Sequence, residues 1–207
     1  MKRKIAAAFL ILGLLSSAEE AMGVEEAKYT VVERQGDIEI RDYAPCVLAE
    51  VVVAAGLEEA GDQAFSKLFR YISGDNQARG KIAMTAPVAQ EAREKIAMTA
   101  PVGQERTPTG YAVSFMMPAG YTLETLPVPA DPAVNLRQVP ARRMAAIRYS
   151  GGWSEAGFRK HKQELEGWMR AKGLEAAGEV VWARYNPPFM PWFLRRNEVL
   201  IPLGAAP

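Results

Sequence analysis

Apolar and polar residues alternate along much of the chain, and two stretches replace this alternation with a helical spacing. Apolar positions from Leu57 to Ile72 recur every three or four residues, which predicts an amphipathic helix that ends at Ser73-Gly74. A second helix is expected from a Ser154 cap to about Lys172. The alternating stretches predict strands within Tyr29–Val53, Tyr111–Met117, Val134–Val139, Arg142–Tyr149, Glu179–Tyr185 and Glu198–Pro202.

The order of these elements is the same in the two halves of the chain. Each half has strands, then one helix, then further strands. Segregated strands and helices of this kind are typical of an α+β domain. We therefore expect an antiparallel curved sheet or distorted β-barrel with two flanking helices, built from pseudo-duplicated halves. No linker divides the sequence, so residues 24–207 are expected to form a single domain.

One octapeptide, Lys-Ile-Ala-Met-Thr-Ala-Pro-Val, occurs twice, at Lys81–Val88 and at Lys95–Val102. The copies start 14 residues apart and match at every position. Since successive side chains of an extended chain point to opposite faces, the even offset keeps both copies on the same face. We therefore expect adjacent strands or a hairpin. The side chains expected to point inward are Ile82, Met84, Ile96 and Met98.

This octapeptide resembles the signature segment of the SOUL family of heme-binding proteins, and the resemblance covers roughly Tyr29–Leu203. It is also carried by LFRYISGDN at Leu68–Asn76, YAVSFMMP at Tyr111–Pro118 and the segment ARYNPPFMPWFLRRNEVLIPL at Ala183–Leu203. The resemblance implies a distorted β-barrel with two helices. It also implies a protein that carries, buffers or sequesters heme or a related tetrapyrrole and is not an enzyme.

Two other functions are compatible with the same pattern. The fold resembles the effector-binding domains of some bacterial transcription regulators, so one alternative is a binding module for another amphipathic small molecule. The other is a small hydrolase with a pocket glutamate as general base, for which the candidates on predicted strands are Glu33, Glu39 and Glu50. A Soret band on heme titration would separate heme binding from both.

The N-terminal segment has the layout of a signal peptide. Lys2–Lys4 is positive, Ile5–Leu15 is apolar, and Ala21-Met22-Gly23 fits a small-x-small cleavage site. The apolar part is too short to span a bilayer comfortably. We therefore expect residues 1–23 to be removed and the mature protein to be exported to the periplasm, with no stable membrane insertion. An uncleaved N-terminal anchor is the alternative.

Charge and cysteine content narrow the possible partners. Without residues 1–23 the chain has 22 basic and 22 acidic residues, because three basic and two acidic residues leave. A neutral chain lacks the basic surface that nucleic-acid binding requires, so no nucleic-acid partner is expected. Cys46 is the only cysteine, so there is no CxxCH motif and any heme would be held noncovalently. A Cys46–His161 dyad remains possible, whereas no common enzyme motif occurs.

His161 is the candidate iron ligand and metal site, because it is the only histidine and lies between Phe158 and Leu165 on an apolar helix face. The alternative is a histidine at the edge of the core that is bonded to a backbone carbonyl. Met84 and Met98 could line a porphyrin pocket or donate a thioether to iron. Plain core packing is their alternative role, since methionine fills irregular apolar gaps.

The run Tyr185–Arg196 is dense in proline, aromatic and basic residues. Aromatic side chains would stack on a porphyrin ring, and guanidinium groups would pair with its propionates. The alternative is a loop that closes one end of the barrel, with its arginines paired to surface carboxylates. The candidate heme contacts in this run are Phe189, Trp192, Phe193, Arg195 and Arg196.

Overall fold

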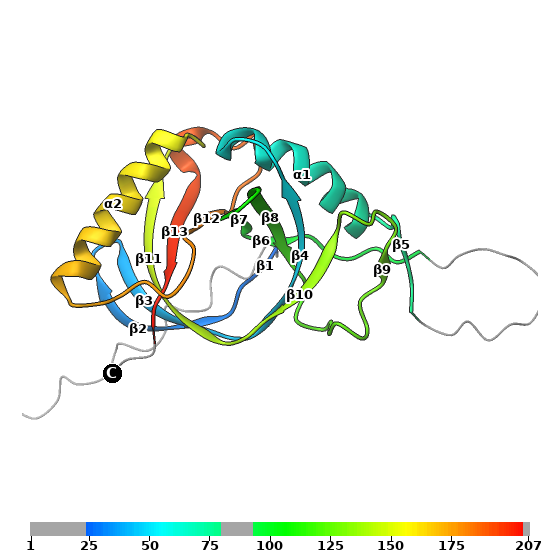
Figure 1. Ribbon diagram of the computed structural model, residues 1–207, viewed down its shortest axis with the longest axis horizontal. Helices are drawn as coiled ribbons and strands as arrows, with labels where there is room; N and C mark the ends of the chain where they lie inside the picture. The colour runs from blue at the N-terminus through cyan, green and yellow to red at the C-terminus, as the bar shows by residue number, and fades with distance from the viewer. Residues whose placement is uncertain (1–23, 80–92, 205–207) are drawn as a thin grey trace, which may run out of the picture.

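The computed structural model describes residues 24–79 and 93–204. Its main sheet contains β2 (Tyr29–Gln35), β3 (Ile38–Tyr43), β4 (Cys46–Val53), β7 (Val102–Thr107), β8 (Gly110–Met116), β10 (Asn135–Val139), β11 (Arg142–Ser150), β12 (Val181–Arg184) and β13 (Arg196–Pro202). These nine strands lie in the order β10-β4-β8-β7-β12-β13-β11-β3-β2, and every neighbouring pair is antiparallel. The sheet curls into a half-barrel (Figure 1).

Two helices, α1 (Leu57–Ile72) and α2 (Glu155–Ala171), cover the outside of the curl (Figure 1). Helix α1 packs on β4 and β8, and α2 packs on β11 and β13. Both helices lie on the same face of the sheet, because one row of register partners runs from the strands under α1 to those under α2. That row is Val51, Val113, Gln104, Trp182, Val199 and Ile147.

The two halves of the chain exchange their first strands. The first half runs β3, β4, α1, β7, β8 and the second runs β10, β11, α2, β12, β13. Strand β3 pairs with β11 of the second half, while β10 pairs with β4 of the first half. The expected pseudo-duplicated α+β fold is confirmed, and the exchange makes one continuous sheet from both halves.

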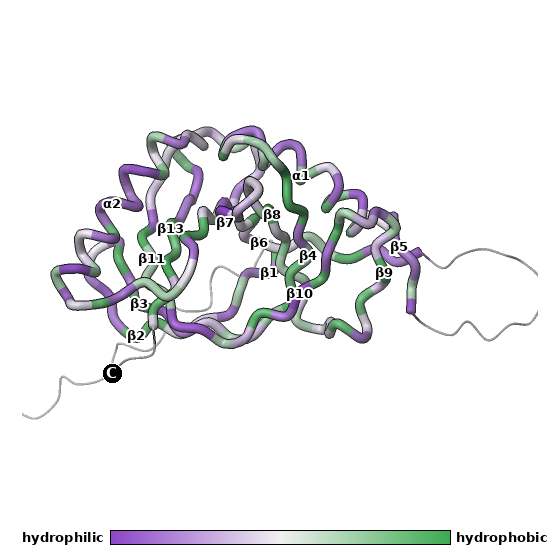
Figure 2. The backbone as a smooth tube through the Cα atoms, viewed as in Figure 1, coloured by the Kyte–Doolittle hydropathy of each residue, from purple (hydrophilic) through white to green (hydrophobic). Residues whose placement is uncertain are grey.

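The sheet has an outer face under the helices and an inner face inside the curl, and both carry buried apolar residues. On the outer face, one cluster surrounds α1 and another surrounds α2. On the inner face, the buried cluster consists of Met144, Ala146, Val181, Ala183 and Leu200. Figure 2 shows hydrophobic stretches along β4, β11 and β13, whereas both helices carry hydrophilic positions on their turns. No helix in the described part of the chain is long and apolar enough to cross a membrane.

Two details of the expected packing differ in the structure. Phe65 and Phe69 belong to the apolar spacing of α1, yet they are 39% and 49% exposed, because the buried face of the helix is centred on Ala60, Ala64 and Leu68. Residues 95–98 of the second octapeptide form no strand.

In the second octapeptide, strand structure begins only at Thr99. Strand β6 (Thr99–Ala100) pairs in parallel with β1 (Glu25–Glu26), and β5 (Asn76–Gln77) pairs with β9 (Val128–Pro129). Ile96 is buried and Met98 packs against the α1 cluster, so the second copy does turn these side chains inward. The first copy, with Ile82 and Met84, lies outside the described residues.

Candidate functional site

The N-terminal ends of α1 and α2 meet over the middle of the outer face (Figure 1). The backbone N–H of Glu155 donates to Glu58 Oε1 at 2.8 Å and so links the two helix starts. Because helix N-termini carry partial positive charge, this meeting point favours negative groups. We call the surrounding residues the helix junction: Gly61, Tyr149, Trp153, Trp182, Arg184 and Asn197.

Arg184, on β12, is a largely buried cation at the centre of the helix junction. Its Cζ lies 5.1 Å from the ring centroid of Trp153 and 5.3 Å from that of Trp182. Within the described residues, its side chain makes one long hydrogen bond, from Nη2 to Gln104 Oε1 at 3.4 Å, and no ion pair. Burial lowers the pKa of this guanidinium from its ordinary value, and the charge of Asp62 opposes that change. Arginine keeps its charge even so, which leaves a cation in need of an anion.

Unpartnered polar atoms collect around this arginine. Across residues 24–79 and 93–204, six buried side-chain nitrogen or oxygen atoms lack a hydrogen-bond partner, and five of them lie in the helix junction. Such atoms are rare in native structures, and a bound ligand is one reason for their presence. A hydrogen bond from Trp182 is among the influences that lower the pKa of Tyr149, so these two atoms serve each other in part. The free donors are then Trp153 Nε1 and Arg184 Nε, and an anionic oxygen would satisfy both. The five are Tyr149 Oη, Trp153 Nε1, Trp182 Nε1, Arg184 Nε and Asn197 Oδ1.

Strand pairing brings these groups together from distant parts of the chain. Asn197 of β13 is the register partner of both Arg184 on β12 and Tyr149 on β11, so the three lie side by side on the outer face. Gly61 leaves the space that the guanidinium fills, because a Cβ at this position would lie 2.5 Å from Arg184 Nη2. A glycine inside a helix destabilises it by about 1 kcal/mol relative to alanine, so its presence is consistent with this close approach.

His161 lies at the edge of the helix junction. Its ring stacks on Tyr149, with centroids 3.9 Å apart and planes 10° from parallel, and its Nδ1 lies 2.8 Å from the carbonyl oxygen of Gly157. Burial raises the pKa of Tyr149 to about 12, against the opposing effects of Trp182 and Arg184. This is the arrangement of a histidine bonded to a backbone carbonyl at the core edge. A neutral ring that donates from Nδ1 leaves the Nε2 lone pair for a ligand.

The run between β12 and β13 adds an exposed aromatic surface next to the helix junction. Phe189, Trp192 and Phe193 are 85%, 64% and 57% exposed, and the last two lie in a short 3-10 helix, η2 (Trp192–Leu194). Arg195 fixes the shape of the run, because its Nε and Nη2 donate to the carbonyl oxygens of Met190 and Pro188 at 2.8 and 2.6 Å. The Arg195 guanidinium also lies 4.5 Å from the Trp153 ring centroid, which joins the run to the helix junction.

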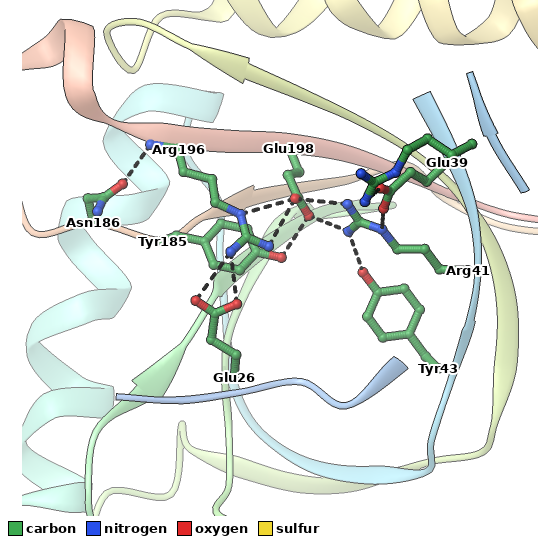
Figure 3. Close-up of polar contacts among 9 residues, drawn as sticks. Glu26, Glu39, Arg41, Tyr43, Tyr185, Asn186, Arg196 and Glu198 are labelled. Atoms are coloured by element: carbon green, nitrogen blue, oxygen red, sulfur yellow. Dashed lines mark hydrogen bonds and ion pairs between the residues drawn. The ribbon is translucent and has the colours of Figure 1, made fainter. Parts of the chain in front are cut away.

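Two other candidate residues lie away from this site, and a third is outside the described residues. Arg196 lies on the inner face, where it pairs with Glu198 at 3.1 Å and Glu26 at 2.9 Å (Figure 3). Met98 packs in the α1 cluster, which is the packing role considered for it, and Met84 lies outside the described residues.

The residues considered for catalysis either lie on opposite faces of the sheet or are held in ion pairs. Cys46 faces the inner cavity, while His161 belongs to α2 and stacks on Tyr149 at the outer face, so the two do not form a dyad. Each glutamate considered as a general base is held in an ion pair: Glu33 with Lys172, Glu39 with Arg34 and Arg41, and Glu50 with Arg137. The described residues hold no group of three or more His, Cys, Asp or Glu side chains that could bind a metal ion. A heme iron needs only one such ligand or none.

Comparison with known families matches residues 24–202 to the SOUL heme-binding proteins. The chain belongs to the SOUL family. It is also 25% identical over 142 residues to heme-binding protein 1 of Xenopus tropicalis, which covers 69% of this chain and 70% of that protein. Membership confirms the resemblance shown by the octapeptide, and with it the expectation of a heme-binding protein.

Solved structures share the fold of this SOUL protein at low sequence identity. A hydrolase from Listeria innocua superposes with a TM-score of 0.54 and 11% identity, over 84% of this chain and 94% of that one. The EcmrR C-terminal domain gives the same TM-score and identity, over 86% of this chain and 99% of that one. These likenesses establish a common fold and carry no information about the ligand.

Sequence reasoning missed the centre of the helix junction. The strand expected at Glu179–Tyr185 is present as β12, and Arg184 occupies its outer face. Trp182 and Arg184 alternate with Val181 and Ala183, so the pattern itself puts a tryptophan and an arginine together on one face. A glycine within the apolar spacing of the first helix was the second available signal.

Proposed function

We propose that this SOUL protein binds heme noncovalently at the helix junction and the adjoining aromatic run, and that it carries or buffers the heme. Family membership supports the ligand, and the buried, unpaired Arg184 supports the place. Heme combines a flat apolar ring with two anionic propionates. The helix junction offers donors to the propionates, and the exposed aromatic run offers surfaces to the ring.

In this proposal the residues have separate roles. Arg184 and the N–H group of Trp153 bind a propionate, while Gly61 leaves room for the guanidinium. Phe189, Trp192 and Phe193 cover the ring and exclude water from it. Arg195 does not contact the ring and instead holds the run in shape. His161 stays a candidate axial ligand through Nε2, with Nδ1 fixed by Gly157. Bound heme would supply the iron and the absorbance by which binding is observed.

We also propose that the protein has no catalytic turnover and works outside the cytoplasm. The ion-paired state of Glu33, Glu39 and Glu50 supports the first point, since a general base needs a free carboxylate within reach of substrate. The layout of residues 1–23 supports the second. Mass spectrometry of the protein from its native host is expected to find a mature chain that begins near Val24. An intact N-terminus in a cytosolic fraction would contradict export.

Heme titration of residues 24–207 tests the proposal. We expect a saturable Soret band and quenching of tryptophan fluorescence, since Trp153, Trp182 and Trp192 lie at the site. Arg184→Gln is expected to weaken binding about tenfold or more, because a hydrogen bond to a charged group contributes roughly 1.5–3 kcal/mol. Arg148→Gln is the matched control, since Arg148 is exposed on the other face of β11.

These experiments test heme binding and the location of the site separately. Absence of a Soret band at micromolar heme would refute heme binding by this chain. A normal band that is insensitive to Arg184→Gln would keep the function and refute the site. The dimethyl ester of the same porphyrin should bind wild type and the Arg184 variant with similar affinity, because its propionates carry no charge.

A further inference from the structure

A separate apolar cavity lies on the inner face, on the side of the sheet away from the helix junction. Its volume is about 240 Å³. The cavity is therefore smaller than the pockets of about 300–1,000 Å³ that hold drug-sized ligands, and far too small to enclose heme. Its apolar wall comes from strands β4, β8, β11, β12 and β13 through Leu48, Met116, Met144, Val181 and Leu200.

The N-terminal segment 25–28 closes one side of this cavity. Glu26 bonds to Arg196 with both carboxylate oxygens, at 2.9 and 3.2 Å, and Figure 3 shows it reaching from β1 to the buried pair of Arg196 and Glu198. Glu25 Oε1 accepts a hydrogen bond from the backbone N–H of Ala119 at 3.0 Å. Both acidic residues of the lining are thus already engaged.

The basic residues of the lining are not engaged. Lys28 and Arg142 make no ion pair and no side-chain hydrogen bond within residues 24–79 and 93–204. Arg142 lies close to the wall of the cavity: burial raises the pKa of the Cys46 thiol, and the charge of Arg142 opposes that rise. An apolar cavity whose acids are paired and whose cations are free favours a ligand with an apolar body and one negative group.

We propose that this inner cavity binds a small amphipathic carboxylate. Its apolar chain lies between Met116, Met144 and Leu200, and its carboxylate faces Arg142 and Lys28. This site is independent of heme binding, because the sheet separates it from the helix junction.

Octanoate binding, followed by NMR of protein labelled with ¹³C at the methionine methyl groups, tests this proposal. Octanoate is expected to shift the signals of Met116 and Met144 in a saturable way. The signal of Met169 should not move, because Met169 belongs to α2 and is buried between this helix and the outer face of the sheet. Signals are assigned with single Met→Leu variants.

Charge recognition is tested with two adjacent arginines of β11. Arg142→Gln is expected to weaken octanoate binding about tenfold or more, since it removes a charge-assisted contact. Arg143→Gln is the matched control, because Arg143 points away and pairs with Asp42 at the surface. Octanol should bind more weakly than octanoate to wild type, and Arg142→Gln should not change its affinity.

Three results would overturn the proposal. One is the absence of any shift of Met116 and Met144 at millimolar octanoate. The second is equal affinity of wild type and Arg142→Gln for octanoate. The third is octanol binding as tight as that of octanoate. Heme titration of the same variants separates this site from the one proposed above, because Arg142→Gln should leave the Soret titration unchanged.

Discussion

At the scale of single residues, Arg184 has an environment that a stable fold alone does not require. A buried charge without a partner is destabilising, and it is usually removed or paired. The contacts of the Arg184 guanidinium with the rings of Trp153 and Trp182 offset this cost only in part, because cation–π contacts contribute about 0.5–2 kcal/mol. The residue is therefore best explained by a ligand that completes its contacts.

This explanation predicts opposite effects of Arg184→Met on stability and on binding. Methionine keeps the apolar stem and removes the unpaired charge, so the free energy of unfolding should stay the same or rise by about 1 kcal/mol. Heme affinity should fall as in the glutamine variant. Urea unfolding and Soret titration measure the two effects. A loss of stability above about 2 kcal/mol would mean that the guanidinium is already satisfied in the free protein.

His161 allows a second prediction at this scale. His161→Phe keeps a ring to stack on Tyr149 but removes both nitrogens. We expect heme affinity to change by less than about threefold, because the pocket and Arg184 dominate binding. The position of the Soret band is the deciding measurement. A shifted band together with strongly weakened binding in this folded variant would show that the imidazole ligates iron.

At the scale of elements, hydrophobic periodicity predicted both helices closely and most strands of the main sheet, but it missed β7 and placed a strand at residues 95–98, where there is none. The expected helix from Leu57 to Ile72 has these bounds, and the second begins after its Ser154 cap, whose side chain accepts from Gly157 N. Periodicity could not predict that Phe65 and Phe69 are exposed, because it does not tell which side of a wide apolar stripe contacts the sheet. The site was harder still, since Tyr149, Trp153 and Arg184 meet only through the pairing of distant strands.

Helix α1 supports a prediction about its glycine. Gly61→Ala should raise the intrinsic stability of the helix by up to about 1 kcal/mol. The new Cβ would displace the Arg184 guanidinium, whose Nη2 would otherwise lie 2.5 Å away, so heme binding should weaken. Gly167→Ala in α2 is the control, because its Cβ would meet nothing closer than 3.8 Å. Unchanged heme affinity in Gly61→Ala would show that the position of Arg184 does not matter.

At the scale of the whole molecule, a buried ion-pair network ties β1, β3 and β13 together. Arg41 of β3 bonds to Glu198 of β13 at 2.7 Å, and Arg196 joins Glu198 to Glu26 of β1 (Figure 3). Burial alone would raise the pKa of Glu198. The hydrogen bond and charge of Arg41, the charge of Arg196 and the hydroxyl of Tyr185 reverse this and hold the pKa below its usual value of 4.5.

The direction of that change sets the pH dependence. A carboxylate whose pKa is lower in the folded state stabilises the fold fully above its unfolded value, and this contribution disappears as the pH falls through the folded value. The free energy of unfolding should therefore decrease below a pH of about 4.5. Glu198→Gln should cost roughly 1.5–3 kcal/mol at neutral pH, because it removes the carboxylate that Arg41 and Arg196 share while Arg41 keeps Glu39, and it should make the acid loss shallower. Glu179→Gln, at an exposed position, should change neither.

The place of β13 in the sheet has a consequence for synthesis. Strand β13 follows every other described strand in the sequence, yet it lies between β12 and β11 near the middle of the sheet. The pairs that β13 makes with β12 and β11 can therefore form only after β13 has left the ribosome. Strand β3 likewise cannot pair with β11 until β11 has been synthesised. A product that stops before Arg196 would expose unpaired edges on β11 and β12. Such edges invite aggregation and proteolysis, so incomplete chains should be removed before they can hold a ligand.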